Sequence, residues 1–93
     1  MGPSLNITIS LDAYILSDRS TWLRFKNKQK HKIVYENSSE LRNDYGMILV
    51  NHKKCKNLDY KSSLKLYKWL ASEDAAAIIR NYRVSDSNVF YID

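Results

Sequence analysis

The sequence predicts an α/β fold in which helices flank a mixed β-sheet, on three observations. Short apolar runs of strand length are separated by amphipathic stretches, in the order α, β, α, β, β, α, α, β. The composition is 44% hydrophobic and 27% charged, which is typical of a globular protein and excludes a disordered chain. With 93 residues, the chain is one small domain or part of a larger one, and we expect a thin margin of stability.

The first segment carries two competing patterns. Leu5, Ile7 and Ile9 alternate with polar residues as in a strand, whereas Leu5, Ile9 and Ala13 fit one face of a helix. Periodicity alone leaves both structures open.

A short strand, a turn and a helix follow. The apolar residues Tyr14–Leu16 predict a buried strand, and either Ser17 or Asp18 is suited to cap the next helix. The apolar face of that helix is expected to consist of Trp22, Leu23 and Phe25. The lysine-rich residues 26–30 end the helix, because they cannot enter a core.

The middle of the chain predicts two strands. Residues 32–36 form the first, which stops at the polar residues 37–39. After a loop over residues 40–44, the run Tyr45–Val50 is apolar throughout and is the clearest strand. Continuous apolarity is typical of a strand that is covered on both faces.

Two helices and an apolar tail complete the prediction. Asp59 is expected to cap a helix that carries Leu64, Tyr67 and Leu70 at three-residue spacing. A second helix begins after Ser72, with two acidic residues in its first turn, where they favour the positive end of the helix. Its inner face is predicted to be Ala75, Ile78, Ile79 and Tyr82. Residues 88–92 are predicted to be a short strand or a packed extension.

The net charge favours anionic partners but does not identify which kind of anion the chain binds. The net charge is +5, and such a chain attracts anions, whether nucleic acid, acidic lipid or small oxyanions. Lysines alternate with aromatic residues over 60–69, so a small basic nucleic-acid-binding module is the alternative hypothesis. Such aromatic residues on a helix more often face the core.

Other classes find no support in the residue pattern. The single cysteine, Cys55, excludes an internal disulfide, and two histidines with one cysteine do not provide the usual four ligands of a structural zinc site. No arrangement typical of an enzyme and no glycine-rich phosphate loop is visible, so we expect neither catalysis nor a cofactor nor a metal. No apolar run approaches the length of a membrane span, and no signal peptide is recognised.

The turn at residues 17–21 is the most informative local feature. The hydroxyls of Ser17, Ser20 and Thr21, with the backbone amides of a helix N-terminus, could bind a tetrahedral oxyanion. Arg19 could add positive charge. The alternative is a helix cap with no ligand, which the same spacing also satisfies.

Four segments together resemble the C-terminal part of the tungstate-binding, periplasmic-type solute-binding proteins of ABC transporters. Residues 13–22 read Ala-Tyr-Ile-Leu-Ser-Asp-Arg-Ser-Thr-Trp, similar to Ala-Tyr-x-Leu-x-Asp-Arg-x-Thr-Trp in that family. Residues 43–51 are similar to Asn-x-Tyr-Gly-Val-Ile-x-Val-Asn, and residues 1–6 to a Met-Gly-x-Thr-Leu-Asn helix. The remaining similarity lies in the closing helices, at residues 69–72, 78–79 and 82–84. His52, Glu73 and Ser20 depart from the family pattern at loop and cap positions.

The resemblance implies a partial periplasmic-binding-protein-like fold. It assigns residues 1–40 to the second lobe and residues 45–93 to the hinge crossing and the helices of the first lobe. It places an oxyanion such as tungstate or molybdate between the lobes, and it favours a helix for the first segment. The anion-binding residues that it implies are Tyr14, Ser17, Asp18, Arg19, Ser20 and Thr21.

Further expectations follow from the resemblance. The parent protein would lie in the periplasm or outside the cell and deliver its ligand to a membrane permease. This chain would be a truncated product, with weak or no binding alone. We therefore expect exposed apolar faces on Tyr45–Val50 and on the helix of Leu64, Tyr67 and Leu70, covered by another copy of the chain in a homo-oligomer.

Overall fold

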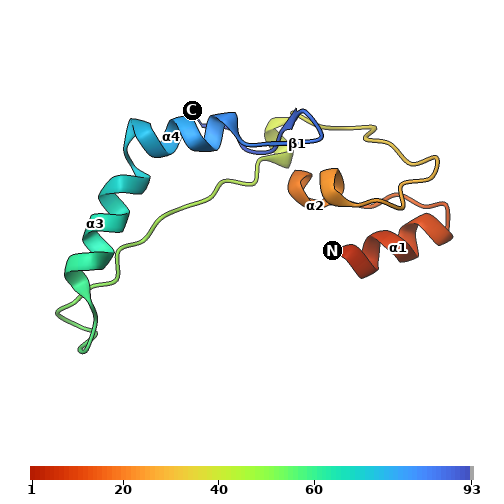
Figure 1. The fold of residues 1–93 in the computed structure, drawn as a ribbon. Helices are drawn as coiled ribbons and strands as arrows, with labels where there is room; N and C mark the ends of the chain where they lie inside the picture. Colours follow the sequence, from red (N-terminus) through yellow and green to blue (C-terminus); the bar gives the residue numbers. More distant parts are fainter. Residues whose placement is uncertain (93) are drawn as a thin grey trace. The chain divides into compact units, whose positions relative to one another are not determined.

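The computed structural model describes residues 1–92, which form two compact units. The first unit joins Met1–Asp44 with Arg83–Val89, and the second joins Tyr45–Tyr82 with the segment from Phe90 onward. The ribbon in Figure 1 gives the order of the elements along the chain. Each unit is described by itself.

The first segment is a helix, α1, which spans Gly2–Ser10. Leu5 and Ile9 are buried, with 0% and 5% of their surface exposed, whereas Ile7 between them is 60% exposed. Burial at a spacing of four follows the helical pattern, and the alternating pattern of a strand is wrong here. Val89 is the third buried apolar residue of this unit.

Two short elements and a hairpin complete the first unit. Helix α2 spans Arg19–Arg24, and a 3-10 helix, η1, spans Ser39–Leu41. Strands β1 (Arg83–Val84) and β2 (Ser87–Asn88) pair antiparallel, with Arg83 opposite Asn88. The two residues of the turn, Ser85 and Asp86, both have positive φ, which is the backbone of a tight two-residue hairpin.

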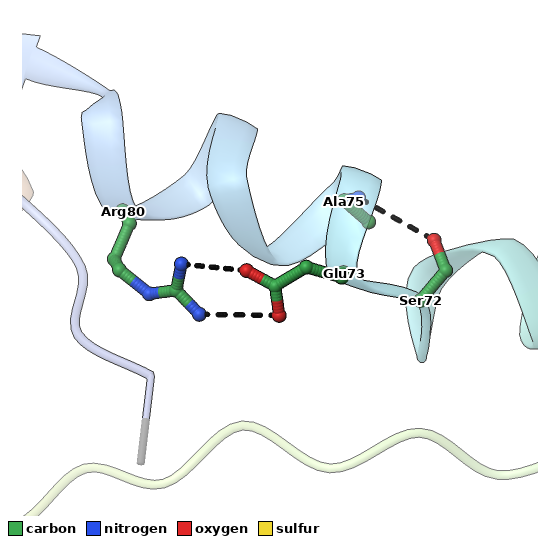
Figure 2. Close-up of polar contacts among 4 residues, drawn as sticks. All are labelled: Ser72, Glu73, Ala75 and Arg80. Carbon is green, nitrogen blue, oxygen red and sulfur yellow. Dashed lines mark hydrogen bonds and ion pairs between the residues drawn. The ribbon is translucent and has the colours of Figure 1, made fainter.

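Helices α3 and α4 follow each other closely in the second unit. Helix α3 spans Tyr60–Leu70, and the Asp59 side chain caps it by accepting a hydrogen bond from the Ser62 amide at 3.1 Å. Helix α4 spans Glu73–Asn81 after a short bend (Figure 1). The Ser72 hydroxyl caps α4 by accepting from the Ala75 amide at 3.4 Å, as Figure 2 shows. The predicted cap at Asp59 is confirmed, and α4 begins after Ser72 as predicted.

The inner face of α4 differs from the prediction. Ala75 and Ala76 are buried, whereas Ile78 is 60% exposed. On the outer side of the helix, Arg80 donates to both carboxylate oxygens of Glu73, at 2.9 and 3.5 Å (Figure 2). The pair lowers the pKa of Glu73, mainly through the hydrogen bond from Arg80. An exposed pair of this kind adds little to stability.

The predicted mixed sheet is not formed in the part of the chain that the structure describes. Tyr14–Leu16, residues 32–36 and Tyr45–Val50 are not strands, and of the tail 88–92 only Asn88 lies in one. The sole strand pair among residues 1–92 is β1 with β2. A strand exists only when a neighbouring strand pairs with its backbone, and these segments have no such neighbour among residues 1–92. The helices with one small sheet remain compatible with an α/β protein.

The predicted exposure of the second unit is confirmed for Tyr45–Val50 and in part for the helix, where Tyr67 is exposed but Leu64 and Leu70 are partly covered. Helix α3 contains no buried residue, and Ile48 in the extended segment Tyr45–Val50 is 92% exposed. The segment and the helix enclose an open groove of about 310 Å³. Among residues 1–92, no helix has the length and apolar character that a membrane crossing requires.

Candidate functional site

The turn at residues 17–21 is organised around one carboxylate. Asp18 Oδ2 accepts hydrogen bonds from Ser20 Oγ at 2.5 Å, from Thr21 Oγ1 at 2.9 Å and from the Thr21 amide at 2.9 Å. The Asp18 carbonyl accepts the first intrahelical bond, from the Trp22 amide at 3.2 Å. Asp18, one of the two predicted cap residues, is therefore the N-cap of α2.

This geometry favours the charged form of the carboxylate. The Ser20 hydroxyl, the Thr21 hydroxyl and the Thr21 amide, in that order of importance, lower the pKa of Asp18 to about 2. Asp18 is thus ionised at neutral pH, and its negative charge lies at the positive end of α2. The turn already holds an anion, and that anion belongs to the protein itself.

Arg19 joins three parts of the first unit. Its Nε donates to the carbonyl oxygen of Asn88 in β2 at 2.8 Å, and its Nη1 forms an ion pair with the Glu36 carboxylate. Arg19 therefore fixes α2 against the hairpin, and Glu36 balances part of its charge. The side-chain oxygen of Asn88 is buried without a hydrogen-bond partner.

Sequence reasoning missed Glu36 and Asn88. They lie 17 and 69 residues from Arg19 in the chain, and no local pattern links them to the turn. The signal available was the arginine in the capping turn, whose guanidinium can donate to an acceptor elsewhere in the chain or to water. That signal does not identify which acceptor it finds.

The two remaining predicted site residues, Ser17 and Tyr14, do not contact the Asp18 carboxylate. Ser17 Oγ donates to the Asp18 carbonyl at 3.1 Å, so it remains part of the turn. Tyr14 is 89% exposed, and within residues 1–92 no hydrogen bond connects it to the turn. The structure therefore brings together Ser17 to Thr21 and leaves Tyr14 apart.

The turn offers few donors to an external ligand. Both hydroxyls next to Asp18 and the Thr21 amide donate to its carboxylate. In the described part of the chain, the amides of Arg19 and Ser20 have no hydrogen-bond partner, so these two N–H groups could contact an anion. An incoming anion would also meet the charge of Asp18. The isolated turn is a helix cap with two spare donors.

The histidines and the cysteine do not converge. His31 Nε2 donates to the Ala13 carbonyl at 3.1 Å, and the His52 ring lies 4.0 Å from the Tyr60 ring, centre to centre. Cys55 is exposed and unpaired. Over residues 1–92 no three His, Cys, Asp or Glu side chains are arranged to hold a metal ion.

Comparison with known proteins gives the family context. No family profile and no solved structure matches the chain. The chain is 32% identical over 94 residues to the tungstate-binding protein TupA of Campylobacter jejuni, covering 97% of this chain and 35% of that protein. It is 33% identical over 82 residues to TupA of Peptoclostridium acidaminophilum, covering 88% of this chain and 29% of that protein.

A third relative comes from Haloferax volcanii. It carries a provisional assignment as an ABC transporter anion-binding protein and is 30% identical over 96 residues. The chain spans about a third of the length of the curated relatives that it matches. The similarity, which extends over nearly all of its 93 residues, shows that the chain is related to the tungstate-binding proteins and corresponds to part of one.

Proposed function

We propose that this chain is a segment of a solute-binding protein that captures tungstate or a similar tetrahedral oxyanion for an ABC transporter. The observation that carries the proposal is the similarity to two tungstate-binding proteins over at least 88% of the chain. The role is capture and not catalysis. The whole protein would work in the periplasm or outside the cell and deliver its ligand to a membrane permease.

Within such a protein, the turn at residues 17–21 would supply one wall of the site. The spare amides of Arg19 and Ser20 suit an oxyanion, because N–H groups at a helix start point toward negative charge. The Ser20 and Thr21 hydroxyls can rotate from Asp18 to the ligand. We propose further that residues 1–40 belong to one lobe and residues 45–93 to the hinge crossing and the other lobe. The boundary between the compact units after Asp44 supports this division, while Arg83–Val89 pack with the first unit.

Calorimetric titration with tungstate, and with sulfate as a smaller tetrahedral dianion, tests the proposal. The 93-residue chain should bind tungstate weakly or not at all, because its hydroxyls already donate to Asp18. A longer product, in which this chain replaces the matching part of the Campylobacter jejuni relative, should bind tungstate more tightly than sulfate. If that longer product shows no saturable heat with tungstate, the proposed function is wrong. Tight binding by the 93-residue chain would instead show that the binding site needs no residues beyond these 93.

Two variants of the longer product sharpen the assignment of the turn. Thr21→Val keeps the shape of the side chain but removes the hydroxyl, and it should weaken tungstate binding about tenfold if that hydroxyl contacts the ligand. Ser10→Ala is the matched control, because the Ser10 hydroxyl bonds only to carbonyls of its own helix. Equal affinities of both variants and the parent would remove Thr21 from the site.

A further inference from the structure

Helix α2 depends on polar contacts for its place in the first unit. None of its six residues, all within the described part of the chain, is buried. A helix this short is unstable by itself, because it has too few internal hydrogen bonds to offset the cost of starting it. Two contacts of Arg19, the hydrogen bond from Nε to the Asn88 carbonyl and the ion pair of Nη1 with Glu36, join α2 to distant parts of the chain.

Both contacts are made by one rigid group. A guanidinium is planar, so Nε and Nη1 keep a fixed geometry, and holding both atoms fixes the direction of the side chain. The Arg19 side chain is 28% exposed, whereas that of Arg80, which pairs with Glu73 on the outside of α4, is 49% exposed. Water therefore screens the contacts of Arg19 less than those of an ordinary surface pair.

The side chain that holds α2 belongs to the same residue as one of the donors of the candidate site. The amides of Arg19 and Ser20 are the two N–H groups at the start of α2 without a partner in the described part of the chain. A displacement of the Arg19 side chain would move both amides with it. A binding site requires its donors within about 0.5 Å of their productive positions, so such a displacement would weaken binding.

The charge of Arg19 is already matched within the protein. Its guanidinium is paired with the Glu36 carboxylate, and the neighbouring Asp18 is ionised at neutral pH because its pKa is lowered to about 2. Two carboxylates therefore accompany one guanidinium at this turn. An oxyanion that reaches the turn gains from the spare amides and little from this cation.

We propose that Arg19 is a positioning residue of the oxyanion site: it fixes the start of α2 against the Asn88 carbonyl and Glu36, and it does not bind the ligand. The inference rests on the proposed function of the turn. It differs from the expectation that Arg19 adds positive charge at the ligand. It also makes the hairpin of β1 and β2 part of the support of the site, although Asn88 lies 69 residues from Arg19 in the chain.

Tungstate titration of variants of the longer product tests the role. Arg19→Lys keeps the charge but replaces the planar fork with a single point donor, which cannot hold both contacts. We expect it to weaken tungstate binding about tenfold, nearly as much as Arg19→Met. An unchanged affinity of Arg19→Lys would overturn the proposal. Arg80→Met, at an exposed arginine of α4, is the matched control and should keep the affinity of the parent.

Salt dependence separates positioning from direct charge contact. A guanidinium that touched a dianion would make the affinity fall as salt is added, and removing it would flatten that dependence. We expect nearly the same salt dependence for the parent and Arg19→Met. Glu36→Gln keeps an acceptor for Arg19 but removes the opposing charge, and it should change the affinity only about twofold. A flattened salt dependence in Arg19→Met, or an affinity raised about tenfold by Glu36→Gln, would show that the guanidinium acts on the ligand.

Nuclear magnetic resonance of the 93-residue chain tests the contacts without a ligand. The Nε–H proton of Arg19 should exchange with water more slowly than that of Arg80, which pairs with Glu73 through its Nη atoms. Arg19→Lys should shift the amide signals of Ser20 and Asn88, whereas Arg80→Lys should not. Equal exchange of the two arginines, or an unshifted Asn88 signal, would overturn the proposal.

The two levels of the argument fail differently. If the longer product does not bind tungstate, the proposed function and this role of Arg19 are both wrong. If the longer product binds tungstate and Arg19→Lys leaves the affinity unchanged, only the role of Arg19 is wrong.

Discussion

Replacing Asp18 by asparagine tests the account of the capping turn. Asparagine keeps the size of the side chain and its ability to cap, but it removes the charge that three donors stabilise. The comparison therefore isolates the charge of the carboxylate. We expect Asp18→Asn to lower the stability of the first unit at pH 7.

The magnitude follows from the pKa of Asp18. Its value falls from 3.8 to about 2 in the folded chain, which corresponds to an upper limit of about 2 kcal/mol. The side chain is only half-buried, so solvent screening reduces this to about 1 kcal/mol. Because the folded pKa is lowered, the contribution is complete above pH 3.8 and disappears as the pH falls toward 2. The variant should lack this part of the acid dependence.

Urea unfolding followed by tryptophan fluorescence measures the effect. In a Trp69→Phe background, emission comes from Trp22, which lies in α2 next to the cap. Asp12→Asn is the control, since the Asp12 side chain forms no hydrogen bond or ion pair with any residue from 1 to 92. Equal unfolding midpoints for Asp18→Asn and the parent at pH 7, with the same loss between pH 4 and 2, would refute the assigned role of the carboxylate.

Three further changes test the packing and the helix ends. Leu5→Ala should cost about 2–5 kcal/mol in urea unfolding, because Leu5 is fully buried, whereas Leu11→Ala at an exposed site should cost less than about 0.5 kcal/mol. Ser72→Ala should lower the stability of α4 by about 1 kcal/mol, seen as earlier thermal loss of the helical circular-dichroism signal. Gly2→Ala should raise stability by about 0.4–1 kcal/mol, since its added methyl group meets no atom within 4 Å. A change in stability of the opposite sign in any of these variants would contradict the structural reason given for it.

The helix ends could be predicted from the sequence because their chemistry is local. Asp18, Asp59 and Ser72 each accept a hydrogen bond from an amide three residues ahead, so the information lies within a few positions. The contacts of Arg19 with Glu36 and Asn88 could not be predicted, since those partners are set by the tertiary fold. That Ser17, Ser20 and Thr21 bind an oxyanion stays a prediction. The structure adds that their neighbour Asp18 competes for the same donors.

One cause explains both the strands that failed to form and the thin core of the second unit. A helix satisfies its backbone within one segment, so α3 forms even though none of its side chains is buried. A strand needs a neighbour, and Tyr45–Val50 has the apolar residues of a covered strand but no pairing backbone. The apolar sequence of that segment suits a strand covered on both faces, but the structure leaves the segment unpaired and exposed. Residues 1–92 do not provide the neighbouring strand, and a strand supplied from outside them would complete the sheet and the core together.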